Sequence, residues 1–205
     1  IALTDHSKAV TVANGMDEKR TLAQIKKIRA ADAKMDGIRI LAGIEVDILK
    51  DGTLDLDDEV LVQLDVVVAS VHSYMNLERE AMTERLLAAI ENPYTQIIAH
   101  PTGRLLLRRD AFAYDMEEIL DAARLRRVAM ECNAYPDRLD LNDTYLRMAK
   151  NRGVKVVIST DSHTTANLKF MQYGVRMARR GWLEKRDVIN TLPVGKMMAG
   201  LRRKS

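Results

Sequence analysis

The four histidines of this chain stand in four short polar clusters, and each cluster follows an apolar run with the composition of a β-strand. The clusters are Thr4-Asp5-His6, Val71-His72-Ser73, Ala99-His100-Pro101 and Asp161-Ser162-His163. Glu45 and Glu131 follow apolar runs in the same way. Imidazoles and carboxylates without thiolates form a ligand set suited to catalytic Zn²⁺, Mn²⁺ or Fe²⁺. The pattern therefore favours a metal centre, and metals held close together could activate water to hydrolyse a phosphate ester.

Strand-like and helix-like segments alternate along the chain, and this alternation decides how the clusters can meet. Apolar strands are expected at residues 1–4, 38–48, 65–71, 96–99, 128–131 and 154–160. Helices are expected at residues 16–35, 78–91, 115–123, 142–152 and 165–180, with Gly37, Gly153 and Gly181 as stop signals. Alternation of this kind predicts parallel strands joined by crossovers, in a barrel or in an open doubly wound sheet. In a barrel, the carboxyl ends of the strands share one rim, where the clusters would converge.

Several of these residues also have ordinary structural interpretations. A single histidine at a strand end is more often a hydrogen-bonded residue than a metal ligand, and only the repetition in all four reverses that expectation. Asp161 and His163 would otherwise form a polar turn that caps the next helix. Glu45 would otherwise be a solvated residue on an alternating strand, which is the interpretation that we prefer for Asp47.

The residues near the expected ligands have supporting roles in this hypothesis. Glu131 and Asn133 are expected to orient ligands by hydrogen bonds without touching a metal. Arg104 and Arg138, together with Arg108 and Arg109, either reach a substrate phosphate or form a solvated face. Cys132 is expected to be a buried thiol rather than a nucleophile. Met171 and Met177 are expected to fill the core.

The composition limits the alternatives. The chain has 205 residues, 47% hydrophobic and 30% charged, with a net charge of +3, so it is most simply one soluble domain and not a dedicated nucleic-acid binder. No apolar run reaches the roughly 18 residues that a membrane span needs. The single cysteine excludes an internal disulfide, which fits a cytoplasmic location. The basic tail Arg202-Arg203-Lys204 is expected to be a solvated end.

The clusters resemble, in their order, the later motifs of the polymerase and histidinol phosphatase (PHP) superfamily. The motifs are Thr4-Asp5-His6-Ser7, Gly43-Ile44-Glu45, Ser70-Val71-His72-Ser73, Ala99-His100-Pro101 and Thr160-Asp161-Ser162-His163. Together they span nearly the whole chain. Residues 99–104 and 131–141, and residues 161–163 followed by 173–175 and 179–183, are most similar to the C-terminal PHP domain of bacterial family X DNA polymerases.

The resemblance implies a distorted (βα)7-type barrel, of which about six parallel strands are present, with up to three Mn²⁺ or Zn²⁺ ions at the strand ends. The implied metal ligands are His6, Glu45, His72, His100, Asp161 and His163. Glu45, Asp161 and His163 would also be catalytic, and Asp5 and Asn133 would orient ligands. The implied activity is 3′ to 5′ exonuclease or related phosphoesterase action on DNA 3′ ends, next to polymerase domains upstream and without a membrane partner.

The sequence departs from the family because it contains no His-x-His, the family's first motif. We therefore expect residues 1–205 to be a PHP-type domain that lacks its first βα unit, holds fewer metals, and is weakly active or inactive. Two other functions remain open. One is a small-molecule phosphatase of the histidinol phosphate type, and the other is a non-catalytic module that braces a polymerase.

Overall fold

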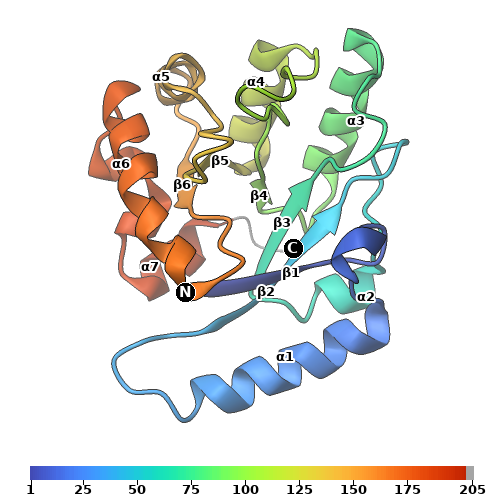
Figure 1. Ribbon diagram of the computed structural model, residues 1–205, viewed down its shortest axis with the longest axis vertical. Coiled ribbons are helices and arrows are strands. Elements are labelled where there is room, and N and C mark those ends of the chain that lie inside the picture. Colours follow the sequence, from blue (N-terminus) through green and yellow to red (C-terminus); the bar gives the residue numbers. More distant parts are fainter. Residues whose placement is uncertain (202–205) are drawn as a thin grey trace.

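Six parallel strands form one sheet in the computed structural model, which describes residues 1–201. The strands lie side by side in sequence order, from β1 at one edge to β6 at the other. Their bounds are β1 Ala2–His6, β2 Leu41–Asp47, β3 Val66–Ser70, β4 Ile97–Ile98, β5 Ala129–Asn133 and β6 Val156–Ser159. The sheet curls into a half-barrel with helices along its outer side (Figure 1). The predicted barrel-type α/β fold with about six parallel strands is therefore confirmed.

The main helices lie where the apolar spacing predicts them, with differences at their ends. Their bounds are α1 Glu18–Asp32, α3 Arg79–Glu91, α4 Met116–Arg126, α5 Asp143–Asn151 and α6 Met171–Arg180. The expected end of the first helix at Gly37 is wrong, because Ile28 is its last buried apolar residue and nothing packs against a further turn. Residues 165–170 form a 3₁₀ helix before α6. Two short helices, α2 Asp58–Leu61 and α7 Val194–Gly200, were not expected.

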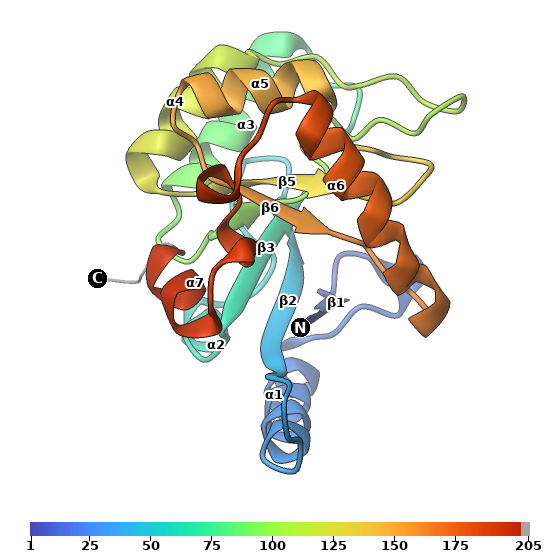
Figure 2. The same cartoon turned by 90° about the vertical axis from the view of Figure 1, so that its left-hand side faces the viewer.

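The two faces of the sheet are buried in different ways. The helix-covered face carries the larger core, which includes Ile44, Val67 and Met130. On the other face, the amino ends of the strands form a smaller apolar layer that packs against the segment containing α7 (Figure 2). This layer contains Leu41, Val66, Ile97, Ala129, Ile189 and Leu201. Since side chains alternate along a strand, the polar residues Glu45, Ser70, Glu131 and Asn133 lie further along this same face, at the carboxyl ends.

The two edges of the sheet differ in how they are covered. Along β6, Val156 bridges to Val188, and the side-chain amide of Asn190 pairs with the N–H and C=O groups of Ile158 at 3.1 and 2.7 Å. At the other edge, β1 pairs with β2 alone among the strands that the structure describes, apart from a bridge between Ser7 and Met16 at its end. The strand that carries His6 is therefore the open edge.

Four smaller expectations concern the surface and the core. No helix within residues 1–201 is both long and apolar enough to cross a lipid bilayer. The basic tail, Arg202-Arg203-Lys204, lies outside the described residues. Cys132 is buried as a free thiol, as predicted. Met177 packs against the core, but Met171 is 36% exposed, so its expected role as core filler is wrong.

Candidate metal centre

Four of the six predicted ligands meet around the carboxylate of Glu45. β1 and β2 pair in register so that His6 lies beside Glu45, and His72 and His100 each follow the end of a neighbouring strand by two residues. Glu45 Oε1 is 3.0 Å from His100 Nε2 and 3.3 Å from His72 Nε2. Glu45 Oε2 is 3.6 Å from His6 Nδ1. Burial alone would raise the pKa of Glu45, but hydrogen bonds from His100 and His72 hold it well below its usual value.

The four imidazole rings form a continuous row at this rim. Ring centroids are 5.1 Å apart for His6 and His72, and 5.3 Å apart for His72 and His100. The ring of His163 lies 6.2 Å from that of His6. All four strand-end clusters that contain a histidine therefore converge in space, as a barrel rim requires.

The donor atoms at this rim fit a divalent metal ion. One atom each from His6, Glu45 and His72 lie within 4.8 Å of one another. Nδ1 of His6 is buried and has no hydrogen-bond partner among the described residues, which is unusual for a buried polar atom. Burial lowers the pKa of His6, which favours the neutral imidazole that can donate an electron pair. Imidazole nitrogens with a carboxylate match Zn²⁺ and Mn²⁺ better than Ca²⁺.

Asp161 and His163 lie beside this group, on its more open side. Asp161 Oδ2 accepts a hydrogen bond from Asn133 Nδ2 at 3.1 Å and pairs with Arg138 Nε at 3.2 Å. The His163 side chain is 66% exposed, and its Nδ1 lies 2.9 Å from the carbonyl oxygen of Asp161. Because a carbonyl oxygen can only accept, Nδ1 carries the proton and Nε2 of His163 is left free.

Asp47 is part of this site, and the expectation that it is a solvated strand residue is wrong. Its side chain is buried, and Oδ1 accepts hydrogen bonds from His72 Nδ1 at 2.9 Å and from the His72 backbone N–H at 3.1 Å. This contact directs Nε2 of His72 toward Glu45. Alternation along β2 places residues 45 and 47 on the same face, so the argument that selected Glu45 could also have selected Asp47.

We expect Asp47→Asn to lower the affinity for Mn²⁺ by about 10- to 100-fold, because the carboxylate that orients His72 is lost. Isothermal titration calorimetry with the wild-type and variant proteins measures this change. Asp51→Asn, which removes an exposed carboxylate four residues further on, is the matched control and should leave the affinity unchanged. Equal affinities of wild type and Asp47→Asn would show that Asp47 does not orient a ligand.

Metal binding should also depend on pH through His72. Burial lowers the pKa of His72, but Asp47 and Glu45 outweigh this effect and raise it to about 9. A metal ion needs the neutral imidazole, so binding must displace a proton below that pH. We expect the apparent Mn²⁺ affinity to rise by up to about tenfold per pH unit toward pH 9 and then to level off. Calorimetry in buffers of different ionisation enthalpy would detect the released proton, and a flat profile would contradict the prediction.

Glu131 and Asn133 each form a hydrogen bond with a predicted ligand, Glu131 with the backbone of His100 and Asn133 with the carboxylate of Asp161. The carboxylate of Glu131 accepts from the His100 backbone N–H, from Ser159 Oγ and from Asn133 Nδ2. Burial raises the pKa of Glu131 to about 7. His100 has a φ of +27°, a strained conformation that its bond to Glu131 helps to hold.

Two other predicted residues do not contact the ligands. Asp5 is exposed, and its carboxylate accepts a hydrogen bond from Gln24 at 3.2 Å, because it alternates with His6 along β1 and lies on the opposite face. Arg104 donates to the carbonyl oxygens of Arg138 and Leu139 and so helps to fix that loop. Arg138 differs from both, since it pairs with Asp161.

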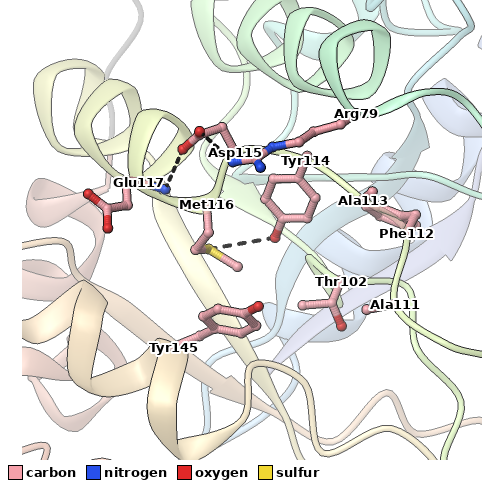
Figure 3. Close-up of a pocket in the computed structure, with 10 residues that line it drawn as sticks. All are labelled: Arg79, Thr102, Ala111, Phe112, Ala113, Tyr114, Asp115, Met116, Glu117 and Tyr145. Atoms are coloured by element: carbon pink, nitrogen blue, oxygen red, sulfur yellow. Dashed lines mark hydrogen bonds and ion pairs between the residues drawn. The ribbon is translucent and has the colours of Figure 1, made fainter.

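A separate pocket of about 580 Å³ lies between the loop before α4 and helix α5 (Figure 3). It is lined by Arg79, Thr102, Phe112, Tyr114, Asp115 and Tyr145, among others, and by none of the predicted ligands. Several of its polar groups already have partners within the protein. Arg79 pairs with Asp115 at 2.7 Å, and the Tyr114 hydroxyl donates to Met116 Sδ at 3.7 Å. The candidate site is therefore the rim around Glu45 and not this pocket.

The class of protein is therefore a parallel α/β half-barrel with a candidate metal site of histidine and glutamate side chains at its strand ends. No protein-family profile matches the chain. The chain is 44% identical over 203 residues to the DNA polymerase/3′-5′ exonuclease PolX of Bacillus subtilis, and the match covers 99% of this chain and 36% of that protein. It is 28% identical over 216 residues to a probable phosphatase of Thermoanaerobacter sp., covering 100% of this chain and 82% of the relative. A probable phosphatase of Shewanella oneidensis is 29% identical over 176 residues, covering 82% of this chain and 65% of the relative.

These relatives and the fold together identify the family. The chain belongs to the PHP phosphoesterase family, and its PHP-domain relatives include both PolX and the probable phosphatases. It spans about a third of the length of the PolX relative, since the match covers 36% of that protein.

Proposed function

We propose that this protein is a metal-dependent phosphoesterase that hydrolyses phosphodiester or phosphomonoester bonds at DNA 3′ ends. The observation that carries the proposal is the convergence of His6, Glu45 and His72 within 4.8 Å at the strand ends. The identity of 44% to a relative named as a polymerase and 3′-5′ exonuclease supports DNA as the substrate. Polymerase domains of that kind are the partners that this proposal implies.

The proposed ligands are the six residues predicted from the sequence: His6, Glu45, His72, His100, Asp161 and His163. Glu45 is placed to serve more than one ion, because its two oxygens face different histidines. Bound Mn²⁺ or Zn²⁺ would polarise the phosphate and favour the ionisation of water. No side-chain nucleophile is required, which fits the burial of Cys132.

The chain's own residues account for substrate binding and proton movement. Arg138 pairs with Asp161 through Nε, while its Nη1 is buried and has no hydrogen-bond partner within residues 1–201. A phosphate oxygen is a suitable acceptor for this N–H group. In the hydrolysis, the oxygen of water bonds to phosphorus, the bond to the sugar oxygen breaks, and that oxygen takes up a proton. The His163 side chain is exposed and its Nδ1 contacts the carbonyl oxygen of Asp161, so its Nε2 would be available to move a proton.

A small-molecule phosphatase is the second candidate, because the chain covers 82% of the length of probable phosphatases at 28% identity. Such an enzyme would have the same metal centre and would differ in the substrate that it binds there. The two candidates are separated by offering single-stranded DNA and histidinol phosphate to the same protein.

The test uses 5′-labelled single-stranded DNA and the 205-residue protein with added Mn²⁺ or Zn²⁺. Because the chain lacks the His-x-His motif, we expect slow, stepwise release of 3′ nucleotides that stops when EDTA removes the metal. Release of phosphate from histidinol phosphate without cleavage of DNA would favour the second candidate. Failure to act on either substrate, with no measurable metal binding, would overturn the proposed function and favour a bracing module.

A further inference from the structure

Three aromatic side chains form a row next to the proposed metal centre. We call Tyr135, Phe170 and Tyr173 the aromatic row. The ring of Phe170 meets that of Tyr135 edge to face with centroids 5.2 Å apart, and it lies 6.0 Å from the ring of Tyr173. The row joins the loop after β5 to the start of α6. Neither the metal site nor the proposed hydrolysis uses these side chains.

The close packing of α6 against the sheet brings the row together. A Cβ atom at Gly174 would lie 2.5 Å from Ile158 Cγ2 and 2.9 Å from Ala134 Cβ, so only glycine allows α6 to approach this far. Tyr173 precedes Gly174, and Tyr135 follows Ala134, so this contact holds both tyrosines near Phe170, which contacts each of them. A larger residue at position 174 would separate them.

Two hydrogen bonds through Asn133 connect the backbone of Tyr135 to Asp161, one of the proposed metal ligands. The backbone N–H of Tyr135 donates to Asn133 Oδ1 at 2.9 Å. The side-chain amide of Asn133 in turn donates to Asp161 Oδ2 at 3.1 Å, on the carboxylate that Arg138 also contacts. The aromatic row is therefore linked through Asn133 to Asp161 and Arg138, the groups proposed to lie at the phosphate.

The row is accessible and lies in a basic setting. Tyr173 is 36% exposed, while Tyr135 and Phe170 are half-buried. The aromatic row therefore ends in an exposed ring that packs on less exposed ones. Lys169 and Arg176, on either side of Tyr173 in sequence, are exposed and form no salt bridge within the part of the chain that is described. Aromatic rings that alternate with free cations are the usual means of holding single-stranded nucleic acid, because every base has a face that can stack.

We propose that the aromatic row stacks the terminal base of a single-stranded DNA 3′ end and so positions the last phosphodiester bond at the metal centre. This inference rests on the proposed function and names the part of the substrate that the site recognises. Stacking would be tolerant of base identity, since it uses the ring faces and no hydrogen-bond pattern. It would favour an unpaired end, because a paired base is already covered by its neighbours.

The test measures binding without hydrolysis. Metal-free protein is titrated into single-stranded DNA that carries 2-aminopurine at its 3′ terminus, and a second DNA carries it several nucleotides from that end. Stacking on a tyrosine quenches the fluorescence, so we expect stronger quenching for the terminal probe. Tyr173→Ala should weaken binding by about fivefold or more and remove the extra quenching, while Tyr173→Phe should retain both.

The matched control is Trp182→Ala, which removes an aromatic side chain that is 63% exposed just beyond the far end of α6. It should behave as wild type. Equal binding and quenching by wild type and Tyr173→Ala would overturn the aromatic-row proposal, even if Mn²⁺-dependent cleavage occurs. Terminal quenching that depends on Tyr173, in a protein that cleaves no DNA with any metal, would support the row and overturn the proposed function instead.

Discussion

Glu45→Gln should abolish tight metal binding and any activity that depends on it. The two Glu45 oxygens lie within 3.6 Å of three imidazole nitrogens, from His6, His72 and His100, so this one carboxylate holds the centre of the site. Glutamine keeps the size of the side chain but removes its charge, and its NH₂ group can only donate. We expect a loss of Mn²⁺ affinity greater than the about 10- to 100-fold that substitution of an orienting residue produces.

Calorimetric titration with Mn²⁺ and cleavage of labelled DNA measure the two effects of Glu45→Gln separately. The matched control is Glu18→Gln on α1, where the carboxylate pairs with Lys8 at the surface. That variant should bind metal as wild type does. If Glu45→Gln retains wild-type affinity, the site around Glu45 is not the metal centre.

Arg85→Met should produce the largest loss of stability, about 3–5 kcal/mol in the free energy of unfolding. Arg85 is 2% exposed, and its guanidinium donates to backbone carbonyl oxygens instead of pairing with a carboxylate. Nε reaches Leu49 O at 2.8 Å, Nη1 reaches Ser73 O at 2.9 Å, and Nη2 reaches Ile48 O. Methionine fills similar space but leaves these buried oxygens without a donor.

Urea unfolding of the metal-free protein, followed by circular dichroism, measures the effect of Arg85→Met. Arg79→Met is the control, because Arg79 lies on the same helix and forms an exposed ion pair with Asp115, which should contribute at most about 1 kcal/mol. Similar losses for the two variants would contradict the prediction. Since the carbonyls held by Arg85 lie next to Asp47 and His72 in sequence, Arg85→Met should also weaken Mn²⁺ binding.

The strands and the positions of the imidazoles were predictable from the sequence because both depend on short-range patterns. An apolar run followed by His or Glu marks a strand and its carboxyl end, and parallel pairing then brings those ends together. The same pattern placed Glu131 and Asn133 behind the ligands. These inferences needed no knowledge of which side chains pack on one another.

The buried positions and contacts of Asp47 and Arg85 were not predicted from the sequence. All seven residues of β2 are buried, because helices cover one face and the interior of the half-barrel covers the other. The assumption that alternate residues of this strand meet water was therefore wrong for Asp47. Arg85 is spaced with Met82, Leu86 and Ala89 on the buried side of α3, but a sequence does not show which carbonyl oxygens a buried arginine will meet.

The open edge at β1 has a consequence for how the centre is assembled. Among the strands that the structure describes, β2 to β5 each pair on both sides, whereas β1, which carries His6, pairs on one side with β2 and is otherwise joined only by the bridge between Ser7 and Met16. A strand supported in this way opens more often than its neighbours, and its amide protons exchange sooner. In the candidate cation site, Glu45 and His72 would then be the firmly held ligands, and His6 the more mobile one. Binding of a metal ion by His6 would then stabilise β1 and slow amide exchange along β1 far more than along β3.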